Sequence, residues 1–493
     1  MGMNTIADLP FEPSAQLDML EQYKPLTKQD TEQFGQGITQ VNKETGLGLL
    51  LIKQVVKAHP GDPLRQADYF FGKFKIPAGT GIQRKASIRT HHDYLKRLNS
   101  SIRDLASMNI KIRNLTELSK THMTLLAKKW VKDGLSSSTM ANKVTVLHRM
   151  GVWMGKPHMC PHLPELLVEI GESPDLAHRQ YTAIVSKAVT ARDIDPQQLF
   201  IQMDELCLVA GLQLRLQLHF GLRVMETVMF KPFAADRGKE LFVMDGTKGG
   251  KARMVPIETE AQRTLLEECK TIASGNTKGI LSEGKRKLYQ AVNRYYYLCN
   301  KIGLTKKDLG ATSHGLRHTF ANEQFKKITG VDSPVNGGAR MPQTEEVQAR
   351  IAVSRMLGHE RHSITSAYLG NHLTLDRSRR ANVKSLIQKL ESSQDLRQLV
   401  RVEGLARVWV VGPAAVGAPI GQHLLICVQP IEGGEAQPDT GMRVAELVGR
   451  IFGKPCACIT HASFESQGFE GFESLELIGL TGDRALISPT HLA

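Results

Sequence analysis

The sequence predicts a multidomain protein in which a helical bundle and a mainly α-helical domain with a small β-sheet precede a small α/β or α+β module. Its 493 residues provide for two to four domains, and 41% hydrophobic residues suffice for their cores. Apolar residues recur at helical spacing from about residue 84 to residue 392, whereas short strand-like runs dominate after residue 401. The net charge changes sign between these regions, which is typical of a domain boundary.

Five parts follow from these patterns. They are an N-terminal accessory region of unknown role (1–83), a helical bundle (84–160), a linker (161–194), a mainly helical domain (195–392) and an acidic module of unknown role (401–493).

The overall composition favours an intracellular protein with an anionic partner. The chain carries 63 Lys and Arg against 49 Asp and Glu, a net charge of +14, which indicates nucleic acid before a membrane. No apolar run reaches 18 residues and the first twenty residues carry no basic residue, so we expect neither a transmembrane helix nor a secretory signal. The seven dispersed cysteines are typical of reduced thiols. We therefore expect a cytoplasmic, nucleoid-associated protein without membrane contact.

The positive charge is concentrated in residues 84–155, which hold fourteen basic against four acidic residues. Helical periodicity predicts helices beginning near Ser87, over Thr116–Val131 and from Ser136 to Trp153, the first and last with serine N-caps. On charge alone, this bundle presents either a solvated basic face or a DNA-binding face. The candidate DNA contacts are Arg84, Lys85, Arg89, Lys96, Arg97, Lys143 and Arg149, and Lys251 further along the chain is a further candidate.

The segments on either side of the bundle are less informative. In 1–83 a short helix over Gly46–Val56 and a strand over Tyr69–Ile76 are expected, as part of an accessory DNA-binding arm or of a cap on the bundle. The segment Pro157–Pro164 interrupts the helical pattern and is interpreted as a linker. Its alternating His and Cys residues lack a fourth ligand, so no metal site is predicted.

The domain over 195–392 is expected to begin with one long helix from Pro196 to about Val224. Strands over Leu241–Met244 and Arg253–Ile257 then form a β-hairpin whose glycine-rich turn carries two lysines. Helices continue to about Leu390, apart from a loop over Ser333–Gln343. That loop is interpreted as an insertion that holds a DNA contact, a subunit contact or nothing.

The last part, 401–493, has six basic against ten acidic residues and is a poor candidate for phosphate contact. Its glycine-rich loop Gly412–Gly421 lacks the Lys-Ser/Thr of a phosphate-binding loop. A protein partner for this module is our expectation. Its predicted elements are strands over Ala406–Val411, His423–Val428, Ala457–Thr460 and Leu475–Leu480, and a helix over Met442–Phe452.

Four short blocks carry the residues suited to phosphate chemistry. They are Gly221-Leu222-Arg223 followed by Glu226, the hairpin turn with Lys248 and Lys251, His314-Gly315-Leu316-Arg317-His318-Thr319-Phe320, and Leu357-Gly358-His359 followed by Tyr368. In this order the blocks resemble the tyrosine recombinase (phage integrase) family through its patterns G-L-R-x-x-E, K-G-G-K-x-R-x-V-P, H-x-L-R-H-T-F and L-G-H-x8-Y. The resemblance covers about 84–392, where 84–155 resembles the family's core DNA-binding domain.

The resemblance implies a role for each residue. Tyr368 is the expected nucleophile that forms a 3′-phosphotyrosyl link. Arginine forks stay protonated and reach two phosphate oxygens at once, which suits Arg223 and Arg317 for stabilising the transition state. His314 and His359 are the further phosphate donors or proton carriers, and Glu226 orients the groups around it.

The same resemblance implies how the reaction proceeds. Lys248 brings the proton to the leaving 5′-oxygen, with Lys251 as its rival on the same turn. Religation uses the energy stored in the protein–DNA ester, so no metal, ATP or other cofactor is expected.

The leading hypothesis is a site-specific recombinase that integrates or excises a mobile element as a homotetramer on double-stranded DNA attachment sites. The alternatives are a catalytically silent DNA-binding regulator and a type IB-like topoisomerase. In compact family members a short helix after the tyrosine docks on a neighbouring subunit, and Val383–Leu390 is the segment suited to that here.

Overall fold

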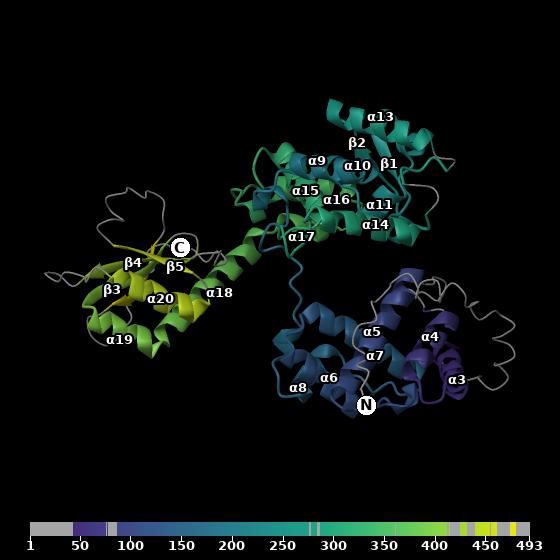
Figure 1. Ribbon diagram of the computed structural model, residues 1–493, viewed down its shortest axis with the longest axis horizontal. Coiled ribbons are helices and arrows are strands. Elements are labelled where there is room, and N and C mark those ends of the chain that lie inside the picture. The colour runs from purple at the N-terminus through teal and green to yellow at the C-terminus, as the bar shows by residue number, and fades with distance from the viewer. Residues whose placement is uncertain are drawn as a thin grey trace, which may run out of the picture. The chain divides into compact units, whose positions relative to one another are not determined.

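The structure is a computed structural model. It describes residues 43–74, 76, 86–275, 278–282, 286–359, 361–411, 414, 424–430, 439–453, 455–460 and 474–479. The predicted contacts Arg84 and Lys85 and most of the predicted loop Gly412–Gly421 lie outside these residues. The chain divides into two compact units, 1–180 and 181–493, whose elements are drawn in Figure 1. Among the described residues, no helix combines the length and apolar character needed to cross a membrane.

The first unit is a helical bundle with one hydrophobic core. Its elements are α3 (Lys43–Ala58), α4 (Pro63–Lys73), α5 (Ile88–Ser107), η1 (Leu115–Glu117), α6 (Lys120–Lys132), α7 (Ser137–Trp153), α8 (Leu163–Glu169) and η2 (Pro174–Ala177). The predicted N-caps are present, because Ser87 Oγ accepts from the Thr90 N–H and Ser136 Oγ accepts from the Thr139 N–H.

Helices α3 and α4 are part of the bundle's core. The indole of Trp153 at the end of α7 lies 5.8 Å from the ring of Phe70 on α4 and 4.8 Å from that of Phe74, the residue after α4, measured between centroids. Helix α3 comes so close to α7 that a Cβ at Gly48 would lie 2.8 Å from Trp153 Cβ. The described part of the N-terminal region therefore caps the bundle, which favours that interpretation over a separate arm.

Two local predictions for this unit were wrong, and one predicted helix is present with a later start. Tyr69–Ile76 is not a strand, because Tyr69 belongs to α4, which starts with Asp62 as N-cap and Pro63 in the first turn. The second predicted helix, from Thr116, begins only at Lys120. The segment Pro157–Pro164 is not a linker, because it folds into the bundle and continues into α8.

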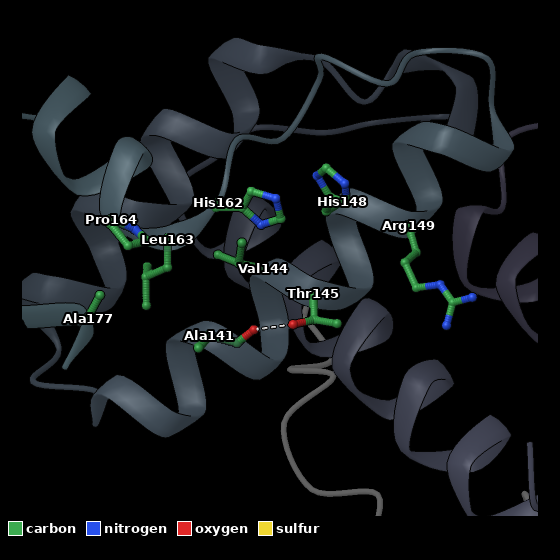
Figure 2. A pocket seen from close by; sticks show the side chains of 9 residues that line it. All are labelled: Ala141, Val144, Thr145, His148, Arg149, His162, Leu163, Pro164 and Ala177. Atoms are coloured by element: carbon green, nitrogen blue, oxygen red, sulfur yellow. Dashed lines mark hydrogen bonds between the residues drawn. The ribbon is translucent and has the colours of Figure 1, made fainter. Parts of the chain in front are cut away.

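The burial of three side chains explains why Pro157–Pro164 folds into the bundle. Met159, Cys160 and Leu163 are buried in the core of the first unit. A shallow pocket lies beside this segment, where His162 stacks on His148 of α7 with ring centroids 4.8 Å apart (Figure 2). His148 Nδ1 is also 2.7 Å from the carbonyl oxygen of Cys160. The first unit thus extends beyond residue 160, to the division at 180.

In the second unit an N-terminal segment and η3 (Thr190–Arg192) are followed by helices α9 (Pro196–Leu206) and α10 (Leu208–Phe220), which were expected to form one long helix. The chain is extended at Cys207, and α10 folds back on α9. Arg215 of α10 holds both carboxylate oxygens of Asp204 on α9. Gly211 leaves the space that this carboxylate fills. The single long helix was therefore a wrong prediction, because hydrophobic periodicity does not register a reversal of the chain.

The other elements of this domain surround two hydrophobic cores that share α10. They are α11 (Val224–Val228), α12 (Pro232–Ala235), β1 (Glu240–Val243), η4 (Lys248–Gly250), β2 (Arg253–Pro256), α13 (Glu260–Ser274), α14 (Leu288–Lys301), α15 (His314–Thr329), η5 (Pro334–Asn336), α16 (Gln343–Met356), η6 (His362–Thr365), α17 (Ser366–Leu369) and α18 (His372–Glu391). Strands β1 and β2 form the predicted antiparallel hairpin. The predicted insertion Ser333–Gln343 is η5 and a loop that runs to α16.

The C-terminal module has a third core and a four-stranded sheet in the order β5-β4-β3-β6. Its strands are β3 (Leu405–Val411), β4 (Leu424–Pro430), β5 (Cys456–Thr460) and β6 (Ser474–Gly479), and its helices α19 (Gln394–Val402) and α20 (Thr440–Phe452) pack on the sheet (Figure 1). Each strand overlaps the predicted one. Leu386 and Leu390 of α18 are buried in this core, so those side chains, expected to dock on a neighbouring subunit, are covered by their own chain.

Candidate active site

The predicted site residues come together around the buried ring of Tyr368 on α17. Arg317 and His314 stand in the first turns of α15, Arg223 precedes α11, and His359 follows α16. Gly221 ends α10 with a φ of +59°, and the ring of Phe320 occupies the space that a side chain there would need. The turn that leads from α10 to Arg223 therefore packs against α15, the helix that carries Arg317.

Arg317 is fully buried and held by fixed acceptors. Its guanidinium donates to the carbonyl oxygens of Gly221 and Leu357, the latter at 2.6 Å, and its Nε donates to the Tyr368 hydroxyl at 3.3 Å. Burial lowers the pKa of this guanidinium to about 10. It therefore stays protonated at neutral pH and places a cation beside the tyrosine oxygen.

Arg223 is held by Glu226, three residues later. Arg223 Nη1 donates to Glu226 Oε1 at 2.8 Å, and its Nη2 donates at 3.2 Å to the same Leu357 carbonyl that Arg317 uses. Its side chain is 21% exposed, so part of the fork faces solvent. The two arginines are thus fixed side by side, one enclosed and one open to a ligand.

Glu226 is the anionic centre of this arrangement. Arg253 of β2 donates to both of its carboxylate oxygens, at 2.9 and 2.6 Å, and donates from Nε to the carbonyl oxygen of Met356. Burial alone would raise the pKa of Glu226, but the hydrogen bonds and charges of Arg253, then of Arg223, lower it to about 2. The positioning role expected for Glu226 is therefore matched by its contacts.

Three histidines surround the tyrosine. Their ring centroids lie 4.5 Å (His318), 5.9 Å (His359) and 6.1 Å (His314) from that of Tyr368. Burial, followed by neighbouring positive charge, lowers the pKa to about 4 for His314 and His359 and to about 3 for His318. All three are thus neutral at pH 7. Within the described part of the chain, His359 Nε2 and His318 Nδ1 are buried without a hydrogen-bond partner.

The two hairpin lysines are not part of this cluster. Lys248 and Lys251 are exposed on the turn between β1 and β2, where Gly249 and Gly250 have positive φ. Of the two, Lys248 is the one whose charge contributes to the low pKa of His359. The structure therefore brings together every predicted catalytic side chain except the lysine, and places Lys248 on the hairpin rather than against Tyr368.

Three residues near the site were not expected from the sequence. Arg253 stood in the K-G-G-K-x-R-x-V-P block, but its sequence did not reveal that it holds Glu226. His318 follows Arg317 in the sequence, where its position in the block does not mark it as a neighbour of the Tyr368 ring. Lys187 is exposed, and its charge contributes to the low pKa values of His314 and His318; no sequence signal marks it. Among the described residues, no group of three His, Cys, Asp or Glu side chains gathers as a metal site would require.

The DNA contacts predicted in the first unit divide into two kinds. Arg89 and Lys96 are exposed and Arg97 is half-buried on α5. Lys143 is buried instead, with its Nζ 2.7 Å from both Asp104 Oδ2 and Ser100 Oγ. We therefore withdraw Lys143 as a DNA contact, because its ammonium group already has internal partners.

Arg149 is the intermediate case. Its guanidinium stacks 5.2 Å from the Trp153 ring and donates to the Tyr94 hydroxyl at 3.3 Å. Part of this side chain lines the pocket of Figure 2. Its contacts give it a packing role within the bundle.

Comparisons with known proteins identify the family. The family model described as "Phage integrase, N-terminal" matches residues 81–160, and the one described as "Integrase" matches 180–323. Tyrosine recombinase XerA of Thermococcus kodakarensis is 30% identical over 176 residues, 34% of this chain and 53% of that protein. XerA of Thermococcus onnurineus is 28% identical over 170 residues, 34% of this chain and 51% of that protein. Residues 81–160 and 180–323 of this chain therefore match the tyrosine recombinase (phage integrase) family. The family resemblance inferred from the four blocks is thereby confirmed.

The matches cover different shares of the curated relatives and of the solved structures. The chain spans about half the length of the curated recombinases that it matches. Among solved structures, a lambda integrase dimer bound to a COC′ core site aligns with 69% of this chain and 84% of that one, at 14% identity and a TM-score of 0.40. XerH recombinase bound to palindromic difH aligns with 75% and 94%, at 14% identity and a TM-score of 0.39.

Proposed function

We propose that this recombinase cuts and rejoins DNA at specific sites through a 3′-phosphotyrosyl intermediate on Tyr368, and that it integrates or excises a mobile element. The observation that carries the proposal is the contact of the Tyr368 hydroxyl with the Arg317 guanidinium inside a ring of three neutral histidines. A tyrosine placed beside a fixed cation suits attack on a phosphodiester, since the cation also stabilises the charge that develops on the phosphate.

The bond changes balance within the protein and its DNA. The Tyr368 oxygen forms a bond to phosphorus, and the bond from phosphorus to the 5′-oxygen breaks. A neutral His359 or His314 is able to accept the tyrosine proton, because its pKa of about 4 leaves it unprotonated at neutral pH. The leaving 5′-oxygen takes a proton from Lys248, for which the hairpin must move toward the phosphate on DNA binding; Lys251 is the rival donor.

The remaining elements of the proposal concern the assembly. Arg89, Lys96 and Arg97 of α5 contact DNA phosphates, and a homotetramer holds two duplex attachment sites. No metal ion, ATP or other cofactor takes part, because the phosphotyrosyl ester conserves the bond energy for religation. The acidic C-terminal module binds a protein partner, and the recombinase acts in the cytoplasm at the nucleoid.

A nicked suicide substrate tests the reaction directly. Duplexes carrying candidate attachment sites from DNA that flanks the gene are incubated with wild type, Tyr368→Phe or Tyr297→Phe, with a chelator and without ATP. Tyr297 is an exposed tyrosine of α14 and serves as the matched control. We expect a covalent protein–DNA band on a denaturing gel for wild type and Tyr297→Phe, and its absence for Tyr368→Phe.

Other outcomes point elsewhere. A band that persists in Tyr368→Phe would remove Tyr368 as the nucleophile. Tight, salt-sensitive binding without any band would favour the silent DNA-binding regulator, and cleavage by one subunit on one duplex would favour the topoisomerase.

A further inference from the structure

Residues 182–189, at the start of the second unit, run across the two helices that carry the catalytic side chains. We call this segment the strap. Ala183, Ser186, Ala188 and Val189 are buried, whereas the strap's other side chains are partly or fully exposed. It belongs to the stretch that was predicted to be a linker. Its hydrogen bonds and close contacts join specific atoms of both helices.

The N-terminal part of the strap contacts both ends of α17, the helix that carries Tyr368. The Ala183 N–H donates at 2.8 Å to the carbonyl oxygen of Ser366, the first residue of α17. The Ala183 carbonyl oxygen lies 3.0 Å from where a Cβ of Gly370 would stand, just after α17. Asn371 Nδ2 adds a hydrogen bond of 3.4 Å to Thr182 Oγ1. Tyr368 therefore lies between two points that the strap touches.

The other end of the strap holds the first turns of α15. The Val189 N–H donates at 3.1 Å to Thr319 Oγ1, and the Thr319 hydroxyl donates at 3.2 Å to the carbonyl oxygen of Gly315. The Lys187 carbonyl oxygen lies 2.8 Å from the position of a Cβ at Gly315. Gly315 sits between the catalytic residues His314 and Arg317, so the strap packs directly against the backbone that places them.

Helix α17 depends on such contacts for its position. It has four residues, a single turn, and a helix of that length does not hold its own geometry in water. The Tyr368–Arg317 contact, in turn, requires α17 and α15 to keep a fixed spacing. The strap is hydrogen-bonded to both helices and can set that spacing.

We propose that the strap is a positioning element that fixes Tyr368 against Arg317, and that Thr319 is the positioning residue through which it acts on α15. This inference rests on the proposed function, since its consequence for chemistry is the rate of strand cleavage. Thr319 itself is 1% exposed, and its hydroxyl bonds the backbone of Val189 and Gly315, so we expect its effect to come through the strap.

Two substitutions separate the hydroxyl from the shape of Thr319. Thr319→Val keeps the branched side chain and removes both hydrogen bonds, whereas Thr319→Ser keeps the hydroxyl. We expect Thr319→Val to slow single-turnover cleavage of the suicide substrate about tenfold with unchanged DNA affinity, which corresponds to about 1.4 kcal/mol in the barrier. Thr319→Ser should cleave within about twofold of wild type, on the same energy scale.

A second variant tests the contact between the strap and the backbone of α15. Gly315→Ala inserts one methyl group against the Lys187 carbonyl, while alanine favours the helix itself, so α15 is expected to stay folded. Gly275→Ala is the matched control, because Gly275 has a φ of −74° and its Cβ would meet nothing nearer than 3.7 Å. We expect slower cleavage only for Gly315→Ala.

Amide hydrogen exchange in the free protein gives a readout that needs no cleavage. In Thr319→Val the amides of Ser366–Gly370 and Val189 should exchange faster than in wild type, and Thr319→Ser should restore them. Unchanged exchange in Thr319→Val together with wild-type cleavage in Gly315→Ala would overturn the strap proposal. If wild type forms no covalent complex but the exchange pattern appears, the strap stands and the proposed reaction fails.

Discussion

The two units use positive charge in different ways. In the second unit two arginines of the site are enclosed and held: Arg317 is fully buried, and Arg253 is 7% exposed and pairs with Glu226. In the first unit Arg89, Lys96 and Arg103 lie exposed at seven-residue intervals, on one face of α5. Cations in fixed geometry act on one phosphate, whereas an exposed row attracts a polyanion through its field. The number of charged residues alone does not distinguish these two uses of positive charge.

The largest effect on cleavage should come from replacing a buried cation of the second unit. Arg317→Lys keeps the charge but loses the planar fork that reaches Gly221, Leu357 and Tyr368. We expect covalent complex formation to fall by about 10²–10³, the cost of removing one fixed donor to a developing anion. Single-turnover cleavage of the suicide substrate measures this. Arg103→Lys on α5 is the control, and comparable reductions in both would contradict the distinction between the two units.

A second effect, on stability rather than on cleavage, should follow from breaking the buried pair that supports Arg223. Glu226→Gln leaves the Arg253 guanidinium buried without its anion, which typically costs about 3–5 kcal/mol of stability. Chemical denaturation of the two proteins measures the difference. The control Glu267→Gln removes an exposed carboxylate from α13 and should leave the unfolding midpoint unchanged.

The pH dependence of the same pair has a defined sign. Because the folded pKa of Glu226 is about 2 and the unfolded value is 4.5, its stabilisation is present above pH 4.5 and is lost as pH falls toward 2. In Glu226→Gln this part of the acid transition should disappear. An unaltered acid transition of the second unit would show that Glu226 is not ionised in the folded protein.

The smallest effect per residue should come from the exposed row. Arg89→Gln combined with Arg103→Gln should weaken DNA binding at every sequence and reduce the slope of log K against log salt by about 0.9 for each phosphate that the protein no longer neutralises. Lys143→Met is the matched control, because Lys143 is bound to Asp104. It should lower stability and leave the salt slope unchanged, and a reduced slope would return Lys143 to the set of DNA-binding residues.

Most residues of the candidate active site could be predicted from the sequence. Phosphate chemistry admits few residue types, so Arg223, His314, Arg317, His359 and Tyr368 could be found from their order and spacing, and the structure places them together. The strands of the C-terminal module could also be predicted, because alternation within a few residues reports a half-buried strand without reference to the rest of the chain.

What the sequence left open were the pairings across long distances. Arg253 pairs with Glu226, which is 27 residues away in the sequence. The Val189–Thr319 and Lys143–Asp104 hydrogen bonds span 130 and 39 residues. Periodicity and composition report local preference, and nothing in them selects a partner that packing brings close. The sequence by itself indicated the family and the candidate reactive residues. Only the tertiary structure decided which cations are fixed inside the fold and which are exposed, because burial and partners exist only once the chain has packed.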